Sequence, residues 1–208
     1  MIRGKILITA GSILILAAGG LCVYNLAESR RAGESAAETL AVLKSRIPVQ
    51  TEPAAEPVYP EAYIYTESTA AAEPVQPIEA AGQMYCGYLA IPALELTLPV
   101  ADTLTDAAMK QSPCRYSGSS VTHDLILAAH NYRSQFGRIG HLAADDMLYF
   151  TDCAGQETAF RVVQTEQLSG YDIAEMLAGG GTEWQLTLFT CDLSGRSRIT
   201  VRAAEVKT

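Results

Sequence analysis

The chain has 208 residues, of which 49% are hydrophobic, and this is enough for one packed domain with an appendage. Its formal net charge is −8 at pH 7 and its sequence has no cluster of Lys and Arg, which argues against a nucleic-acid partner. Five cysteines and three histidines are available for a thiol, redox or metal site.

The N-terminal segment is long and apolar. Residues 6–27 contain no charged residue and follow Arg3 and Lys5. A helix needs about 20 apolar residues to span a bilayer, and basic residues gather on its cytoplasmic side. We therefore expect residues 1–27 to form a cytoplasmic tip and a single-pass membrane anchor, with the rest of the chain outside the cell. Arg30 and Arg31 run against this orientation, and a cleaved signal peptide is the alternative.

Residues 28–82 connect this anchor to the remainder. Residues 28–47 are rich in helix formers and predict a juxtamembrane helix. Residues 48–80 contain six of the nine prolines, six glutamates and no basic residue, which indicates an extended, solvated tether. Three tyrosines of this tether could dock on the domain: Tyr59, Tyr63 and Tyr65. A chain that begins near Ala80 is expected to fold without the tether.

Residues 83–208 alternate short apolar runs with turn signals. Strands are expected in GYLAIPALELTLPV, with a kink at its first proline, and in HDLILAAH, DDMLYFTD, ETAFRVVQTEQL, WQLTLFTC and RITVRAAEV. The stretches CAGQ and DLSGRS are hairpin signals, and LTDAAMK and YDIAEMLA predict short helices. Many short strands predict an all-β fold, and we expect a single closed β-barrel with short helices.

The cysteines allow several kinds of chemistry. The sequence contains no CxxC motif, which argues against thioredoxin-like chemistry and zinc-ribbon sites. Cys22 lies in the anchor, whereas the other four lie in the outer domain: Cys86, Cys114, Cys153 and Cys191. Disulfides form readily outside the cytoplasm, and the sequence does not determine whether these cysteines pair. No cofactor and no metal site is expected.

Cys191 ends an apolar strand, and Arg198 begins the strand that returns after the turn. In a hairpin the two would face each other, and facing residues hold their Cβ atoms about 5 Å apart. A guanidinium there could stabilise a thiolate or an oxyanion, although an arginine that merely solvates the barrel rim is the alternative. Alternation places Arg196 in the turn, pointing to solvent, and Arg202 on the same face as Arg198 but too far along the strand to reach the thiol.

A cysteine nucleophile usually needs a histidine. His130 ends the predicted strand LILAA, whereas His123 and His141 fall in loop-like stretches. Strand ends at a barrel rim can converge on one cleft, so His130 is the candidate partner of Cys191. A structural role is the alternative for any single histidine at a strand end.

These segments carry a resemblance. TLFTC followed by Arg198 resembles the TLxTC…R signature of the sortases, which are membrane-anchored cysteine transpeptidases of Gram-positive bacteria. LILAAHNYRSQFGRIGHLAADDMLYF resembles the histidine motif of that family, and the similarity extends roughly from Met84 to Val206. It implies a sortase-like β-barrel catalytic domain in residues 83–208. It also implies that Cys191 is the nucleophile, His130 its acid–base partner and Arg198 the residue that stabilises the transition state.

The resemblance further implies a reaction. An LPxTG-like sorting signal on a surface protein or pilin would be cut after its threonine through a thioacyl intermediate. The acceptor would be an amino group of a lipid-linked cell-wall precursor or a pilin lysine. The tether has no DPW/DPF-type lid element, which favours surface-protein anchoring over pilus assembly.

Three other classes compete with this interpretation. A cysteine peptidase would hydrolyse the same kind of peptide, and an inactive membrane-tethered binding module could share the fold. An L,D-transpeptidase would carry a His/Ser-x-Gly-Cys pattern, whereas Phe-Thr precedes Cys191 here.

Overall fold

The computed structural model describes residues 2–50, 75–177 and 183–206. Its first element is α1 (Ile2–Arg46), one continuous helix that joins the predicted anchor and the predicted juxtamembrane helix. The first proline of the chain is Pro48, so no proline interrupts this helix before it ends. The three tyrosines of the predicted tether, Tyr59, Tyr63 and Tyr65, lie outside the described residues.

The described part of the chain then forms nine strands and four short helical segments. The strands are β1 (Ile78–Ala80), β2 (Gln83–Ile91), β3 (Leu96–Ala101), β4 (Cys114–Ser117), β5 (Leu125–Ala129), β6 (Met147–Asp152), β7 (Glu157–Ser169), β8 (Leu186–Cys191) and β9 (Ser197–Glu205). The helical segments are α2 (Asp106–Gln111), α3 (Ile173–Leu177) and the 3-10 turns η1 (Pro92–Leu94) and η2 (Ile139–His141).

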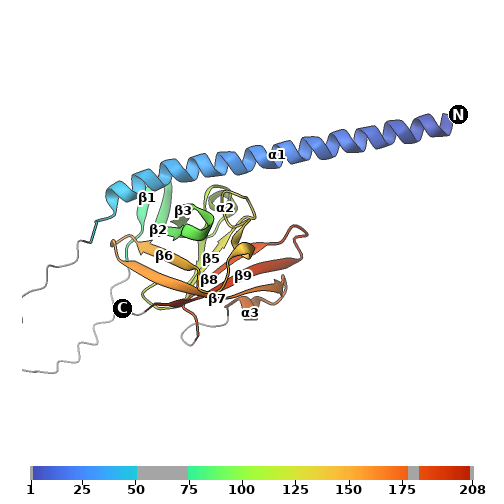
Figure 1. The fold of residues 1–208 in the computed structure, drawn as a ribbon. Coiled ribbons are helices and arrows are strands. Elements are labelled where there is room, and N and C mark those ends of the chain that lie inside the picture. Colours follow the sequence, from blue (N-terminus) through green and yellow to red (C-terminus); the bar gives the residue numbers. More distant parts are fainter. Residues whose placement is uncertain (1, 51–74, 178–182, 207–208) are drawn as a thin grey trace, which may run out of the picture.

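Eight of these strands close into a barrel. Their order is β2-β3-β4-β5-β8-β9-β7-β6, and β6 pairs back onto β2, while β1 adds to β2 from outside the ring. Gly87 permits this closure because it has a φ of 152° and a Cβ there would lie 2.2 Å from the carbonyl oxygen of Thr151 in β6. The predicted fold, a single closed β-barrel with short helices behind a long apolar helix, is confirmed (Figure 1).

The barrel has apolar side chains on both sides of its central strands. Leu127 of β5 and Leu188 of β8 are fully buried in the main core inside the ring. On the outside of the same strands, Ala128 and Phe189 form a second buried cluster with Met176 of α3. Because α3 covers this outer face, every residue of β5 is buried, which explains its uninterrupted apolar sequence.

The C-terminal half of α1 packs on the barrel. Its buried positions follow a spacing of three or four residues, as expected for one face of a helix: Ser29, Ala32, Ala36, Thr39 and Leu43. Ile47, the residue after the helix, continues this spacing and is also buried. Leu43 is fully buried in a cluster with Tyr85 of β2 and Cys114 of β4. A chain that begins near Ala80 therefore loses part of the apolar core, and it also lacks most of β1, which starts at Ile78 within the predicted tether.

Candidate active site

The pairing of β5 with β8 brings His130 and Cys191 to one edge of the barrel. The two strands run parallel and their last paired residues are Ala129 and Thr190. The hydroxyl of Thr190 also donates a hydrogen bond of 2.8 Å to the carbonyl oxygen of Ala129. His130 follows Ala129 and Cys191 follows Thr190 along the sequence. The two residues therefore lie side by side where the pairing of β5 and β8 ends.

Arg198 lies on the other side of Cys191. β8 and β9 form an antiparallel hairpin in which Cys191 is the register partner of Arg198, as the alternation predicted. The strand order therefore places Cys191 between His130 on β5 and Arg198 on β9. Cys191 is a free, half-buried thiol, and two residues earlier on the same strand Phe189 packs in the outer apolar cluster.

The turn between Cys191 and Arg198 is held by its own polar side chains. The carboxylate of Asp192 accepts hydrogen bonds from the hydroxyl of Ser194 at 2.7 and 2.9 Å and from the backbone N–H of Ser197 at 3.2 Å. These hydrogen bonds lower the pKa of Asp192 to about 2, the bond from Ser194 contributing most. Gly195 adopts a φ of 72° and completes the turn. The local sequence DLSG thus fixes the hairpin that sets the register.

The guanidinium of Arg198 lies over this turn. Its Nη1 donates to the carbonyl oxygens of Gly195 and Ser197, both at 3.2 Å. A Cβ at Gly170, which follows β7, would lie 3.2 Å from Nη1, so this glycine leaves room for the arginine. Arg196 is exposed within the turn, as predicted. Of the two arginines, only Arg198 is the register partner of Cys191.

His130 is held through its backbone. Its N–H donates to Oε1 of Gln135 at 3.1 Å, and the amide of Gln135 donates to the carbonyl oxygen of Met109 at 3.2 Å. Gln135 is fully buried. The ring of Tyr132 lies against the imidazole, with 5.0 Å between ring centroids. These contacts leave the imidazole without a carboxylate orienting it among the described residues, in contrast to a Ser-His-Asp arrangement.

Burial lowers the pKa of His130 below its usual value, and the positive charge of Lys110 on α2 lowers it further, while Asp106 acts in the opposite direction. At neutral pH the uncharged imidazole is therefore favoured. An uncharged imidazole can accept a proton from a thiol or an incoming amine, which is the requirement for a general base.

The other two histidines have different surroundings. His123 lies at the opposite end of the barrel, where its Nδ1 is 2.7 Å from a carboxylate oxygen of Glu205. His141, expected as a surface or helix-end residue, lines a pocket of about 410 Å³ together with Cys191, Asn131 and Leu193. Local sequence patterns could not predict this placement of His141, because it depends on the packing of η2 against β9, which lies far away in the sequence.

The helix α3 covers the outer apolar cluster, and hydrogen bonds from Arg202 fix α3 to the barrel. Arg202 is 2% exposed and donates to the carbonyl oxygens of Glu175 and Met176, at 2.5 and 3.0 Å. It also forms an ion pair of 2.9 Å with Glu166 and stacks on Trp184. Arg202 lies four residues beyond Arg198 and is engaged with α3, in agreement with the prediction that it does not serve the thiol.

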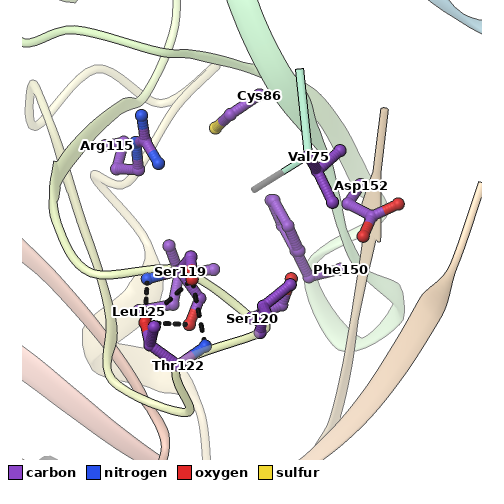
Figure 2. Close-up of a pocket in the computed structure, with 10 residues that line it drawn as sticks. Val75, Cys86, Arg115, Ser119, Ser120, Thr122, Leu125, Phe150 and Asp152 are labelled. Atoms are coloured by element: carbon purple, nitrogen blue, oxygen red, sulfur yellow. Dashed lines mark hydrogen bonds between the residues drawn. The ribbon is translucent and has the colours of Figure 1, made fainter. Parts of the chain in front are cut away.

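Burial disfavours the thiolate form of the three other cysteines of the barrel. Burial raises the pKa of Cys86 to about 12 and that of Cys114 to about 11, and it also raises the pKa of Cys153. All are free thiols. Figure 2 shows Cys86 and Arg115 on facing walls of a second pocket, of about 170 Å³. Arg115 is paired with Asp102 at 2.6 Å, and this pocket also contains Leu125, at the end of β5 opposite to His130.

The described residues contain no group of three or more His, Cys, Asp or Glu side chains that could hold a metal ion. The polar groups that converge on one barrel edge are a thiol, an imidazole and a guanidinium. A thiol with an imidazole on one side and a guanidinium on the other is an arrangement that can carry out acyl transfer, so the fold and the site together are those of a β-barrel protein with a cysteine centre. Residues 89–206, more than half of the chain, match the sortase domain family, and the chain belongs to the sortase family.

Solved structures support this fold. The structure of sortase C from Clostridium perfringens SM101 is 20% identical and superposes with a TM-score of 0.53, covering 64% of this chain and 73% of that one. Sortase C1 from Streptococcus agalactiae is 22% identical with a TM-score of 0.54, covering 63% and 71%. A Clostridium perfringens sortase C with its C-terminal cell wall sorting motif is 22% identical with a TM-score of 0.52, covering 60% and 71%. No curated protein matches the chain.

Proposed function

We propose that this protein is a cysteine transpeptidase in which Cys191 is the nucleophile, His130 the acid–base group and Arg198 the oxyanion or substrate-backbone ligand. The observation that carries this proposal is the strand register, which puts Cys191 next to His130 through β5 and opposite Arg198 through β9. Sortases are typically cysteine transpeptidases, and the three residues fall on the motifs quoted above.

The reaction follows from these groups. His130 first takes the proton of the Cys191 thiol. The resulting thiolate attacks the scissile carbonyl carbon, and the guanidinium of Arg198 stabilises the negative oxygen of the tetrahedral intermediate. The C–N bond then breaks, and His130 supplies the proton that the leaving amine needs. An incoming amine attacks the thioester, gives a proton to His130 and releases the thiolate. The guanidinium must turn from the carbonyl oxygens of Gly195 and Ser197 toward the substrate.

The proposed substrate is a surface protein or pilin bearing an LPxTG-like sorting signal, and the acceptor is an amino group of a cell-wall precursor or of a pilin lysine. Two structural relatives support this class of substrate: one is described with a cell wall sorting motif, and another as pilus-related. α1 is long and apolar enough to cross a membrane, so we propose a single-pass anchor with the barrel outside the cell.

The decisive experiment is mass spectrometry of the intact protein incubated with a panel of sorting peptides, with and without an added amine. The expected result is an acyl adduct on Cys191 and a new amide in the presence of amine. Hydrolysed peptide alone, at equal rates with and without amine, would indicate a cysteine peptidase. A chain that forms no adduct with any peptide or with a thiol reagent at Cys191 would be a binding module.

A further inference from the structure

The two halves of α1 have different surroundings on one straight element. Between Ile13 and Leu26, the large apolar side chains are 53–75% exposed, whereas from Ser29 onward one face of the helix is buried on the barrel. Figure 1 shows α1 as one continuous helix whose exposed half continues the direction of its docked half. The barrel is therefore oriented relative to whatever surrounds the apolar half.

The docking begins immediately after the apolar half ends. Ser29 follows Leu26 by three residues, which is about 4.5 Å of helix rise. The hydroxyl of Ser134 donates to the carbonyl oxygen of Ser29 at 2.6 Å, and the two hydroxyls lie 3.2 Å apart. Gly33 gives Ser134 close access, because a Cβ at Gly33 would lie 3.1 Å from that of Ser134. The loop that follows His130 is thus fastened beside the end of the apolar half.

Tyr132 in the same loop connects the site with the helix. Its ring lies against the imidazole of His130, and burial together with the nearby Glu28 and Tyr24 raises its pKa. Tyr24 belongs to the apolar half, so Tyr132 lies near the level at which that half ends. Tyrosine is enriched at membrane–water interfaces.

Two further apolar side chains project from this end of the barrel. Among its described residues, the most exposed large apolar side chains are Leu193 at 99% and Tyr171 at 90%. Leu193 lies in the β8–β9 turn, and Tyr171 follows β7, whose last residue pairs with the first residue of β9. In Figure 1 this end of the barrel, where β9 begins, faces the same way as the projecting half of α1.

Basic residues accompany these apolar side chains. Arg30 and Arg31 are exposed on the helical turn that contacts Ser134, and Arg133 is exposed in the loop itself. Acidic residues lie at this end as well: Glu28 pairs with Arg31 at 3.4 Å, and Asp172 and Asp192 are the sequence neighbours of Tyr171 and Leu193. Exposed Arg, Leu and Tyr side chains at one end of a protein are typical of surfaces that rest on anionic lipid headgroups.

We propose that this end of the barrel binds the lipid bilayer surface: Tyr171 and Leu193 insert among the headgroups while Arg133 contacts their phosphates. His130 and Cys191 are then held at the membrane surface and not at the distance that a flexible tether would allow. The inference rests on the proposed membrane anchor and adds a second, specific contact with the same bilayer.

The test uses the full chain in nanodiscs of phosphatidylcholine and phosphatidylglycerol. Nitroxide labels are placed at Leu193→Cys, at Arg133→Cys and, as a matched control, at Gln156→Cys in the β6–β7 turn at the opposite end of the barrel. Cys22→Ser and Cys191→Ala remove the exposed and half-exposed reactive thiols, and the raised pKa values of Cys86, Cys114 and Cys153 protect them from labelling. Accessibility to oxygen and to a water-soluble nickel chelate is measured by power saturation.

We expect an oxygen-to-nickel accessibility ratio several-fold higher at positions 193 and 133 than at 156. Equal ratios at all three positions, whether all aqueous or all lipid-exposed, would overturn the proposal. Transpeptidation is assayed separately on the unlabelled protein with a soluble peptide in detergent. If the labels lie at the bilayer but the protein is inactive, the proposed function alone is contradicted. If the protein is active but the labels are in water, the membrane contact alone is contradicted.

Discussion

Cys191 and Arg198 face each other across the β8–β9 hairpin, as the last residue of one strand and the second residue of the next. Arg196 lies two residues earlier, in the turn, and is exposed. The distinction matters because both arginines follow the cysteine closely in sequence, and only one of them belongs to the paired strands.

We therefore expect Arg198→Ala to lower kcat by about 100-fold or more, which is typical of losing an oxyanion donor. Arg198→Lys should also be badly impaired, since lysine lacks the planar two-pronged donor. Arg196→Ala is the matched control and should cost less than about tenfold, or roughly 1.4 kcal/mol. Steady-state kinetics on the three variants would decide, and a crippled Arg196→Ala with an active Arg198→Ala would contradict the assigned roles.

The thiols should differ sharply in reactivity. In a Cys22→Ser background, iodoacetamide near neutral pH should alkylate Cys191 and spare Cys86 and Cys114, whose pKa values are raised to about 12 and about 11. Cys191→Ala should abolish turnover and labelling together, while Cys86→Ser should remain active. Peptide mass mapping after a timed pulse measures this directly, and preferential labelling of Cys86 would contradict it.

The histidines provide a second matched pair. His130→Ala should reduce turnover by about 100-fold to 10,000-fold, because acid–base catalysis and activation of the thiol are lost together. His141→Ala is the stringent control, since His141 shares a pocket with Cys191, and its effect should be mild. If the two variants were equally impaired, the acid–base role would have to be shared or reassigned.

The charge environment of His130 predicts the direction of its titration. Lys110 lowers the pKa of His130 and Asp106 raises it. Removing a nearby positive charge eases protonation, so Lys110→Gln should raise the pKa of His130. Asp106→Asn removes a negative charge and should lower it. Imidazole proton resonances followed against pH in the Cys191→Ala protein would show both shifts, and shifts of the same sign in both variants would refute this account.

The docked half of α1 should contribute directly to the stability of the barrel. Leu43 is fully buried and its neighbour Val42 is 38% exposed, so the two residues compare a buried and an exposed position of one helical turn. Leu43→Ala should lower the free energy of unfolding by about 2–5 kcal/mol through the cavity it leaves. Val42→Ala should change it by less than about 0.5 kcal/mol. Denaturant titration of the full chain in detergent would compare them, and equal losses would mean that the helix is not docked in solution.

Local patterns predicted most of the strands, the hairpin and the position of Arg198, but they did not predict β1 or β4. Alternation in RITVRA places Ile199 toward the core and Arg198 on the other face, and DLSG carries its own turn contacts. The docking of α1 could not be predicted in this way. Ser29, Ala32 and Ala36 are ordinary helix residues, and their buried face is defined by partners distant in the sequence, such as Ser134 for Ser29 and Leu89 for Ala36. His141 near Cys191 is a second case, because its position depends on how η2 packs beside β9.

The parallel pairing of β5 and β8 also has a kinetic consequence. Sixty residues separate His130 from Cys191, and their neighbourhood exists only after β5 and β8 have paired. Contacts between residues so distant in sequence form late, because the loop between them must first be ordered. Until the barrel closes, the thiol of Cys191 therefore has no neighbouring His130. In the proposed mechanism, Cys191 therefore gains its acid–base partner only when β5 and β8 pair within the closed barrel.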